Sequence, residues 1–191
     1  EASEDKLLKL WEGLGYYNRV RNMQKAAQKI EEEYAGKFPE NYEEIKALPG
    51  IGNYTAGAIS SFAYGIPKPA VDGNVLRVVS RLLASDEDIM KASVRTKIEN
   101  AIEPVIPEDA ASDFSQGLIE LGAIVCVPNG EAKCEICPLT GICEAKRLGI
   151  QNELPVKKKA KARRIEERTV LIFKDGDHVA IRKRPDKGLL A

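Results

Sequence analysis

Four cysteines within 18 residues constrain what this chain can fold into more than any other feature of the sequence. Thiolates at such short spacing bind a [4Fe–4S] cluster or a tetrahedral zinc ion, and four inert core thiols rarely gather in this way. In a reducing compartment, disulfides are the weaker alternative. The sequence therefore predicts metal or cluster ligation, although the spacing C-x7-C-x2-C-x5-C by itself leaves the metal open. The four residues are Cys126, Cys134, Cys137 and Cys143.

The length and composition are those of an ordinary globular chain. Its 191 residues, 43% of them hydrophobic, are enough to bury one sizeable core, or two small ones, without disulfides. No apolar run approaches the ~20 residues that a membrane-spanning helix needs. The first residues, from Glu1 to Lys6, are acidic, whereas a signal peptide begins with basic and then apolar residues. We therefore expect a cytoplasmic protein without a membrane partner.

The net charge is zero, but the charge is divided unevenly along the chain. Residues 1–150 carry 17 Lys and Arg against 23 Asp and Glu, and residues 151–191 carry 12 against 6. If residues 1–150 bind a nucleic acid, they must use oriented backbone groups and a local basic face, because their bulk charge does not attract a polyanion.

Helical periodicity dominates up to about residue 150 and predicts an all-α body. Ser3 and Ser93 are expected N-caps, Gly36 is an expected helix end, and residues 111–124 are expected to form one amphipathic helix before the cysteines. Two apolar helix faces are expected, formed by Met23, Ala26, Ala27, Ile30 and Tyr34, and by Val75, Val78, Val79 and Leu82.

The sequence PVKKKAKARRIEER is basic, has few large apolar residues and predicts a linker. After it, two β-like runs flank an Asp-Gly pair, which is typical of a hairpin turn. The expected parts are a helical domain over 1–100, a helical cysteine-binding part over 101–154, the linker over 155–168 and the start of a second domain over 169–191.

A glycine-containing turn lies between two expected helices in the sequence LPGIGNYTAGA. Gly50 and Gly52 remove side chains from this turn, so that bare N–H groups at the start of the second helix can accept a phosphate. The helix dipole favours an anion at the same place. An ordinary helix–helix turn with glycine caps is the alternative.

An acidic residue, Asp72, lies in the sequence VDGNV, about one helix length after this hairpin. As an isolated feature, Asp72 is most simply an N-cap. A carboxylate beside a phosphate-binding hairpin can also stabilise the positive charge that develops on a sugar when its bond to a base breaks. The spacing from the hairpin favours this second interpretation.

The run GLGYYNRVRN, the hairpin LPGIGNYTAGAI, the sequence VDGNV and the cysteine group, in this order, resemble the helix-hairpin-helix DNA glycosylases. The resemblance covers about residues 1–155, and GLGYY is similar to the MutY-type adenine glycosylases in particular. It implies hydrolysis, with base flipping, of the N-glycosidic bond of adenine mispaired with 8-oxoguanine or guanine in double-stranded DNA. It also implies a [4Fe–4S] cluster on the four cysteines, and a monomeric enzyme of the bacterial cytosol.

The resemblance assigns catalytic roles to three residues. Asp72 corresponds to the family's catalytic aspartate, which stabilises or traps the sugar cation, and Asn74 supports it by hydrogen bonding. Tyr54 stands where the related endonuclease III enzymes carry a lysine that forms a Schiff base with the sugar. Because an amine is absent at that position, we expect a monofunctional glycosylase that does not cleave the strand by β-elimination.

The resemblance also implies DNA contacts. Leu14 and Tyr16 correspond to residues that contact the oxidised guanine and fill the base stack, and Gln116 falls where a polar side chain meets the flipped adenine. The alternative is that Tyr16 is an ordinary aromatic residue at a helix end. Gly50, Gly52 and Tyr54 of the hairpin are the expected contacts with the DNA backbone.

The sequence departs from the family at three places. Seven residues separate Cys126 from Cys134, whereas the family usually has six, and a bulge can absorb the extra residue. The family's general acid, which is typically worth about 10²–10⁴ in rate, is a glutamate on a helix before GLGYY, so we expect it outside this sequence. Residues 169–191 resemble only the beginning of the family's α+β Nudix-like domain. We therefore expect a fragment that is cut at both ends.

Two alternatives remain beside an adenine glycosylase. One is a bifunctional glycosylase of the endonuclease III type, which Tyr54 in place of lysine and the continuing second domain argue against. The other is a non-catalytic DNA-binding module, in which hairpin and cluster only position a partner. Asp72 discriminates here, because a pure binding module needs no carboxylate facing a sugar.

Overall fold

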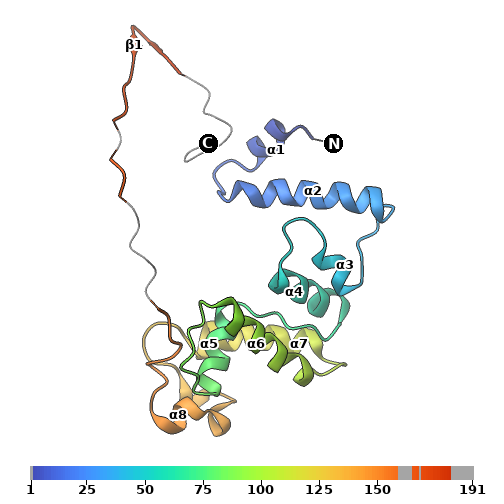
Figure 1. Ribbon diagram of the computed structural model, residues 1–191, viewed down its shortest axis with the longest axis vertical. Helices are drawn as coiled ribbons and strands as arrows, with labels where there is room; N and C mark the ends of the chain where they lie inside the picture. Colours follow the sequence, from blue (N-terminus) through green and yellow to red (C-terminus); the bar gives the residue numbers. More distant parts are fainter. Residues whose placement is uncertain (1, 159–164, 168, 182–191) are drawn as a thin grey trace. The chain divides into compact units, whose positions relative to one another are not determined.

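The computed structural model describes residues 2–158, 165–167 and 169–181. The chain divides into two compact units, Glu1–Lys158 and Lys159–Ala191. Throughout residues 2–158 the regular elements are helices (Figure 1), which confirms the predicted all-α body. The main helices are α1 (Glu4–Leu10), α2 (Tyr17–Glu33), α3 (Tyr42–Lys46), α4 (Asn53–Tyr64), α5 (Gly73–Leu82), α6 (Ala92–Ile102), α7 (Ala111–Glu120) and α8 (Glu144–Leu148). Short helical turns are η1 (Glu103–Val105), η2 (Leu121–Val125), η3 (Cys134–Ile136) and η4 (Thr140–Ile142).

The longest of these helices, α2, begins in a glycine-rich loop and ends at a glycine. Gly15 has φ 68°, and the N-cap Tyr16 lies in the left-handed region as well, at φ 48°. The indole N–H of Trp11 donates to the Gly15 carbonyl at 2.9 Å and ties the loop to α1. At the other end, the N–H of Gly36 donates to the Ile30 carbonyl at 3.1 Å, as a left-handed glycine cap does. Within the described residues, no helix is long and apolar enough to cross a membrane.

The apolar core lies where α5, α6 and α7 meet. Burying a single Val, Leu or Ile side chain stabilises a fold by about 1.5–3 kcal/mol, so this cluster fixes α5 firmly. The predicted apolar face of α5 is confirmed for Val75, Val78 and Val79, which are buried, whereas Leu82 is half-buried. The buried core cluster consists of Val71, Val75, Leu76, Val79, Ile89, Val94, Ile98, Ile102, Ile106 and Ala111.

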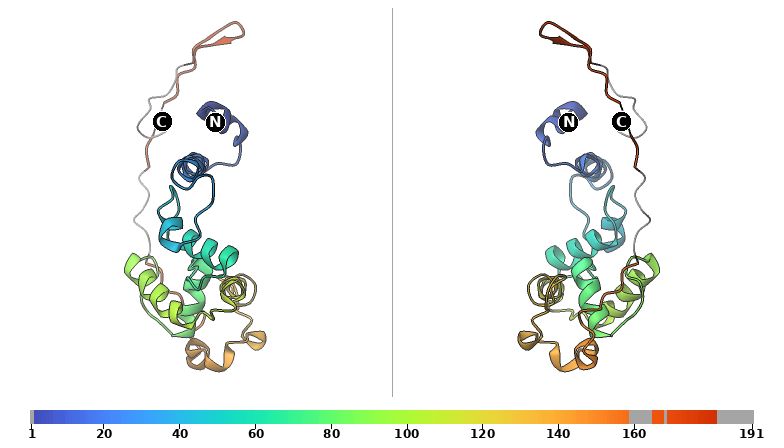
Figure 2. Two further views of the ribbon diagram at one scale, coloured as in Figure 1. Left: turned by 90° about the vertical axis from the view of Figure 1, so that its right-hand side faces the viewer. Right: turned by 90° about the vertical axis from the view of Figure 1, so that its left-hand side faces the viewer.

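The helices follow one another through the first unit in nearly the order of the sequence (Figures 1 and 2). The hairpin helix α4 packs against α3 on one side and α7 on the other. Helix α5 packs against α7 and also against η2 and α8, which flank the cysteines. Helices α7 and α5 together therefore connect the hairpin part of the unit to the cysteine part.

Two local predictions were wrong. The helix predicted over 111–124 ends at Glu120, and η2 continues it as a wider π-type turn. This turn brings Gly122 against Asn74, where an added Cβ would lie 2.6 Å from the Asn74 Cβ. Ser93 does not cap α6, because the helix begins at Ala92 and its N-cap is Lys91, without a side-chain hydrogen bond. Ser3 does cap α1, accepting from the Lys6 N–H at 3.4 Å.

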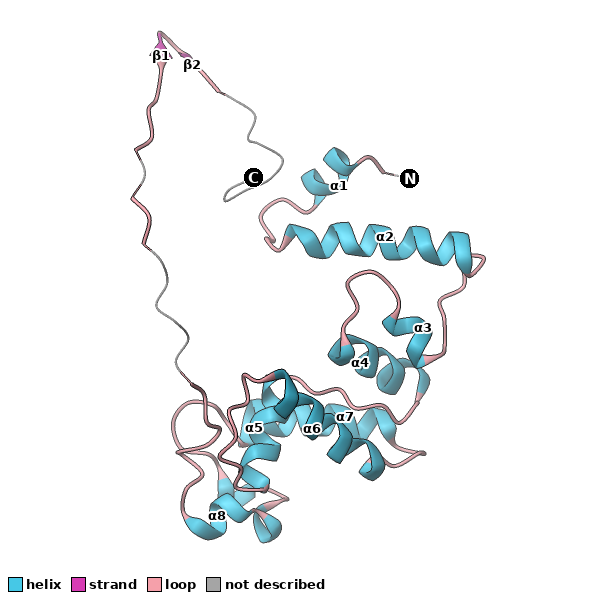
Figure 3. Cartoon of the chain, viewed as in Figure 1, coloured by secondary structure: helices cyan, strands magenta, loops and turns pink. Residues whose placement is uncertain are grey.

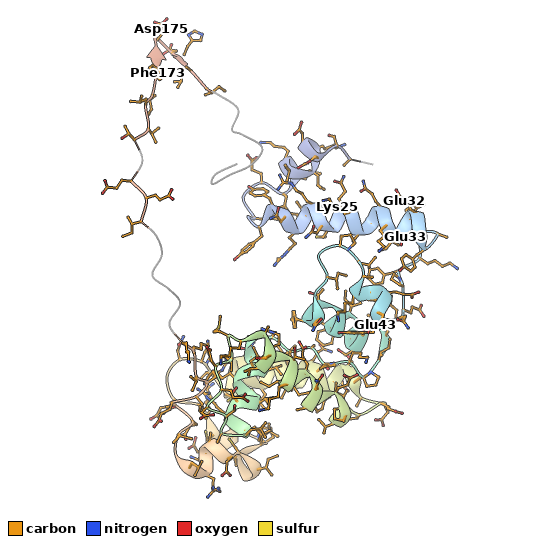
Figure 4. All side chains as sticks on the ribbon, in the orientation of Figure 1. Lys25, Glu32, Glu33, Glu43, Phe173 and Asp175 are labelled. Atoms are coloured by element: carbon orange, nitrogen blue, oxygen red, sulfur yellow. The ribbon has the colours of Figure 1, made fainter. Side chains whose placement is uncertain are left out.

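The described part of the second unit contains one short antiparallel pair, β1 (Lys174–Asp175) and β2 (His178–Val179), as Figure 3 shows. Gly176 turns the chain at φ 56°, as the predicted Asp-Gly signal requires. Phe173, predicted as the end of the first run, precedes β1, and its carbonyl accepts from the Ala180 N–H at 3.0 Å. The hairpin is therefore shorter than predicted and displaced, because both residues of β1 were expected in the turn and no strand forms over 169–173. Figure 4 marks it by Phe173 and Asp175.

Candidate functional site

The hairpin between α3 and α4 exposes a helix N-terminus that no side chain caps. Gly50 has φ 80°, and an added Cβ would lie 2.6 Å from the Asn22 Cβ, so conformation and space both require glycine here. Gly52 is the N-cap of α4 in extended backbone, with open space beside it. Tyr54 follows in the first turn and is 40% exposed. The first N–H groups of α4 are thus accessible to an anion, and the helix dipole favours one there.

The loop before α5 holds Asp72 in a fixed orientation. Asp72 is the N-cap of α5, and its Oδ1 accepts from the N–H groups of Asn74 and Val75, both at 2.8 Å. Its Oδ2 accepts from the Asn74 side-chain amide at 2.9 Å. Since a carboxylate offers about four lone-pair positions, these three bonds leave acceptor capacity for one further group. The N-cap expectation for Asp72 is confirmed, and Asn74 bonds it as the resemblance implied.

Two contacts fix the position of the loop before Asp72. The sequence patterns did not predict either of them. Helix α4 lies so close to it that a Cβ added to Gly57 would collide with the Pro69 carbonyl oxygen. From the other side, the Arg95 guanidinium on α6 donates to the carbonyl of Val71. The hairpin helix therefore contacts the loop at Pro69, and α6 holds it at Val71, the residue that precedes Asp72.

Asn74 connects this loop to a buried arginine. Its Oδ1 accepts from Arg77 Nη2 at 2.9 Å, and the same nitrogen donates to the Gly122 carbonyl at 2.6 Å. Arg77 Nε donates to the Cys126 carbonyl at 2.7 Å. Burial lowers the pKa of the Arg77 guanidinium, although Cys126 and Asp72 oppose the shift; an arginine keeps its charge in any case. A continuous hydrogen-bonded path thus runs from Asp72 to the first cysteine.

The four cysteines line one small cavity, together with Arg81 and Lys146. Each thiol is free and half-buried. Burial raises the pKa of the Cys134 thiol, and the nearby Lys146 ammonium opposes that shift. Over the described ranges, no group of three or more Cys, His, Asp or Glu side chains is arranged to hold a single metal ion. All four cysteines nevertheless line the same cavity.

The remaining predicted residues lie at the surface. Leu14 and Tyr16 are 67% and 83% exposed on the loop before α2, and the Arg19 guanidinium lies 5.7 Å from the Tyr16 ring centroid. Gln116, exposed on α7, donates to the Ser112 hydroxyl at 2.9 Å. Among the described residues, no hydrogen bond, ion pair or ring contact joins Leu14, Tyr16 or Gln116 to Asp72. The structure thus brings together Asp72 with Asn74, and the four cysteines with one another, but leaves these three apart.

Much of the surface of the first unit is acidic, as its composition predicts. Glu32 and Glu33 project from the C-terminal half of α2, and Glu43 from α3 (Figure 4). The opposite end of α2 carries Arg19 and Arg21, next to the loop of Leu14 and Tyr16. Arg21 pairs with Glu4 at 2.7 Å, so Arg19 is the cation that accompanies the exposed aromatic loop.

Comparison with known proteins identifies a family and relatives that this chain resembles. Residues 1–104 match the model of the HhH-GPD superfamily base excision DNA repair proteins. Over 145 residues the chain is 40% identical to the adenine DNA glycosylase of Buchnera aphidicola subsp. Acyrthosiphon pisum, which covers 76% of this chain and 41% of that protein. Over 154 residues it is 39% identical to the adenine DNA glycosylase of Homo sapiens, covering 80% of this chain and 28% of the human protein. The chain thus spans less than half the length of these relatives.

Solved structures give the same relationship. A thermostable thymine-DNA glycosylase superimposes with a TM-score of 0.66 at 27% identity, covering 77% of this chain and 67% of that one. An endonuclease III in non-covalent complex with DNA superimposes with a TM-score of 0.64 at 29% identity, covering 78% of this chain and 68% of that one.

Proposed function

This chain belongs to the HhH-GPD superfamily of base excision DNA repair proteins, and on that premise we propose that the protein containing it hydrolyses the N-glycosidic bond of adenine mispaired with 8-oxoguanine in DNA. The observation that carries the proposal is the Asp72 carboxylate, fixed by three hydrogen bonds next to an uncapped hairpin helix. Curated relatives named adenine DNA glycosylases support the choice of base.

In this proposal the hairpin and Asp72 act on neighbouring parts of one nucleotide strand. The N-terminus of α4, made accessible by Gly50 and Gly52, binds a backbone phosphate. The flipped adenine leaves as the bond between its nitrogen and the sugar C1′ breaks, and positive charge develops on the sugar. The spare acceptor capacity of Asp72 faces that charge, and Asn74 keeps the carboxylate oriented, so that no reorganisation is needed during the reaction. Water then supplies the hydroxyl group at C1′.

Substrate recognition is assigned to the exposed loop and to α7. Leu14 and Tyr16 are free to enter a base stack because they are largely exposed and pack on no core. Extracting a base from the duplex costs a few kcal/mol, and apolar and aromatic side chains that fill the gap offset this cost. Gln116 presents an amide that can read the adenine edge.

Tyr54 sets the reaction type in this proposal. It occupies the first turn of α4, where an amine would form a Schiff base with the sugar. A phenol cannot do so, and the product is therefore an intact abasic strand. This distinguishes the proposal from a bifunctional glycosylase of the endonuclease III type.

The four cysteines would hold a [4Fe–4S] cluster, since they line one hollow. When bound, the cluster supplies four strong bonds that tie η3, η4 and α8 to the end of η2. Iron and sulfide analysis of protein purified without oxygen tests this assignment; one zinc per chain without sulfide would contradict it.

We also propose that residues 169–191 begin a second, Nudix-like domain that recognises 8-oxoguanine. The linker proposed over 155–168 leaves the first unit after Lys158, and the proposed parts 1–100 and 101–154 belong to that one compact unit. The apolar run before β1 supports the proposed second domain, because Val170, Leu171, Ile172 and Phe173 are all largely exposed in the described structure. A strand with such side chains is stable only when further elements cover it.

The test uses the natural gene product that contains residues 1–191. Single-turnover assays compare duplexes with adenine opposite 8-oxoguanine, guanine or thymine. We expect release of adenine from the first two and an uncut abasic strand, and Asp72→Asn should abolish release while binding of the duplex persists. Binding without any base release would identify a non-catalytic module, and strand cleavage at an oxidised pyrimidine would identify the endonuclease III type.

A further inference from the structure

Arg81 lies on α5 one turn after Arg77, and its side chain reaches the cysteine cavity. It is only 4% exposed. Its Nη1 donates to the Cys126 sulfur at 3.3 Å and to the Val127 carbonyl at 2.9 Å, and its Nε donates to the Leu154 carbonyl at 2.9 Å. Arg81 thus joins the segment that carries the first cysteine to the segment that follows the last one.

Among the described residues, Arg81 is the side chain that donates a hydrogen bond to a cysteine sulfur. The backbone N–H groups of the four cysteines are directed elsewhere, since each donates to a carbonyl oxygen. The acceptors are Leu121 for Cys126, Ala132 for Cys134, Cys134 for Cys137 and Thr140 for Cys143. Among the four cysteines, Cys126 is therefore distinguished by the hydrogen bond that its sulfur accepts from Arg81.

The charge of Arg81 points to an anion in the cavity. A guanidinium buried to this extent costs several kcal/mol unless a negative group compensates it. No carboxylate within the described residues forms an ion pair with Arg81. Its acceptors are two carbonyl oxygens and one sulfur, so thiolates are the negative groups within its reach. The other cations that line the cavity, Lys133 and Lys146, are exposed, and water screens them.

We propose that Arg81 is a positioning residue for the iron–sulfur cluster, which holds the Cys126 thiolate by a charge-assisted hydrogen bond and stabilises the electron-rich state of the cluster. The inference rests on the proposed cluster and assigns one residue of its surroundings a defined task. A donor that withdraws electron density from a ligating sulfur favours reduction, because added negative charge is better compensated. Residues around metal ligands that hold them in place typically contribute about 10–100-fold to retention of the metal.

The experiment compares Arg81→Lys and Arg81→Met with a matched control, Arg77→Lys, in the cluster-containing natural protein. Arg77 is also buried and lies one turn away, but it donates to the Cys126 carbonyl and not to the sulfur. Two quantities are measured: the midpoint potential of the cluster by protein-film voltammetry, and the rate of iron loss to a chelator. For both Arg81 variants we expect a more negative potential and iron loss roughly 10–100-fold faster, whereas the potential of Arg77→Lys should stay close to that of the parent.

The outcomes are separable. A parent protein that contains zinc, or no sulfide, overturns the proposed cluster and this inference with it. A parent with a cluster whose potential and iron loss are unchanged by both Arg81 variants overturns the inference alone. Equal shifts in Arg77→Lys also overturn it, because buried charge and packing would then suffice without the bond to sulfur. If the Arg81 variants do not fold, pulsed EPR of the oxidised parent labelled with 15N-arginine decides: a 15N coupling supports the inference, and its absence overturns it.

Discussion

At the scale of a single residue, Asp72 caps α5 with the same carboxylate to which we assign the proposed chemical role. Both donors to Oδ1 are backbone groups of α5, so the bonds that cap the helix also orient the carboxylate. The N-cap and the catalytic interpretation, which compete in the sequence, are therefore compatible in the structure. Asn74 contributes the side-chain bond to Oδ2.

Tyr54→Lys is expected to change the reaction type of the natural protein. The amine would lie in the first turn of α4, where desolvation and the positive end of the helix dipole both disfavour its charged form, leaving it nucleophilic. We expect a covalent adduct trapped by borohydride and some strand nicking, with slower adenine release because a second positive charge approaches the sugar cation. Gel assays on an adenine:8-oxoguanine duplex measure both. Release of adenine by the variant without any adduct would show that position 54 does not determine the reaction.

Gly57→Ala tests the close approach of α4 to the loop before Asp72. The new methyl group meets the Pro69 backbone, which has no rotamer to change, so we expect overpacking to destabilise the fold by about 1–3 kcal/mol. Gly117→Ala is the control, since this helical glycine of α7 has open space beside it and should be neutral or slightly stabilising. Urea unfolding measures both. Equal stabilities of the two variants would contradict the packing of α4 described above.

At the scale of elements, the two glycines of the hairpin are expected to be needed for different reasons, Gly50 for folding and Gly52 for DNA binding. Gly50→Ala should lower stability, because φ is 80° and Asn22 lies in the way. Gly52→Ala should unfold like the parent, since its φ is −96° with open space around it, but it should bind DNA more weakly because the methyl group lies where a phosphate approaches. Denaturant unfolding and duplex binding at fixed salt concentration distinguish the two. Unchanged DNA affinity in Gly52→Ala would remove the hairpin N-terminus from the interface.

Helix α5 unites elements that are far apart in the sequence. Its N-terminus carries Asp72, and its two buried arginines reach η2, the Cys126 segment and Leu154. In the sequence, Arg77 and Arg81 can be noticed because they are charged residues among the apolar residues of a helix. The partners are carbonyl oxygens of loops, which leave no trace in composition or periodicity.

At the scale of the whole molecule, the end of the first unit returns to its core. Leu154 is buried, the Val156 carbonyl accepts from the Ile89 N–H at 3.1 Å, and the Lys158 N–H donates to Asp88 Oδ1 at 3.4 Å. The basic sequence after the cysteines therefore does not leave the unit at once.

Two stop codons in the natural gene test this boundary. A chain ending at Lys158 should keep the stability of its glycosylase unit. A chain ending at Glu153 should lose about 3 kcal/mol or more, because Leu154 is no longer buried and Arg81 Nε and the Ile89 N–H lose their acceptors. Thermal or urea unfolding followed by far-UV circular dichroism compares the two. Identical transitions would show that residues 154–158 do not stabilise the unit.

By itself the sequence determined the helical class, the ends of several elements and the residues that carry chemistry. Ser3, Gly36 and Asp72 form hydrogen bonds to residues only a few positions away. Such local interactions can be predicted from the spacing of residues in the sequence. The cysteine group and the hairpin could be recognised for the same reason, because the residues of each lie close together in the sequence. The sequence did not predict correctly the end of α7, the N-cap of α6, for which Ser93 was expected, or the extent of the β hairpin. The reason is that propensity sets element boundaries only weakly.

Only the tertiary structure decided how these local motifs are joined. Gly57 and Gly122 are glycines because other segments approach them closely, and Arg77 and Arg81 are buried because loop carbonyls and a sulfur from residues 122–154 receive their donors. Contacts over such sequence distances depend on how helices pack, which no pattern of adjacent residues encodes. The sequence thus named the catalytic and the cysteine residues separately, and packing around α5 made them parts of one hydrogen-bonded structure.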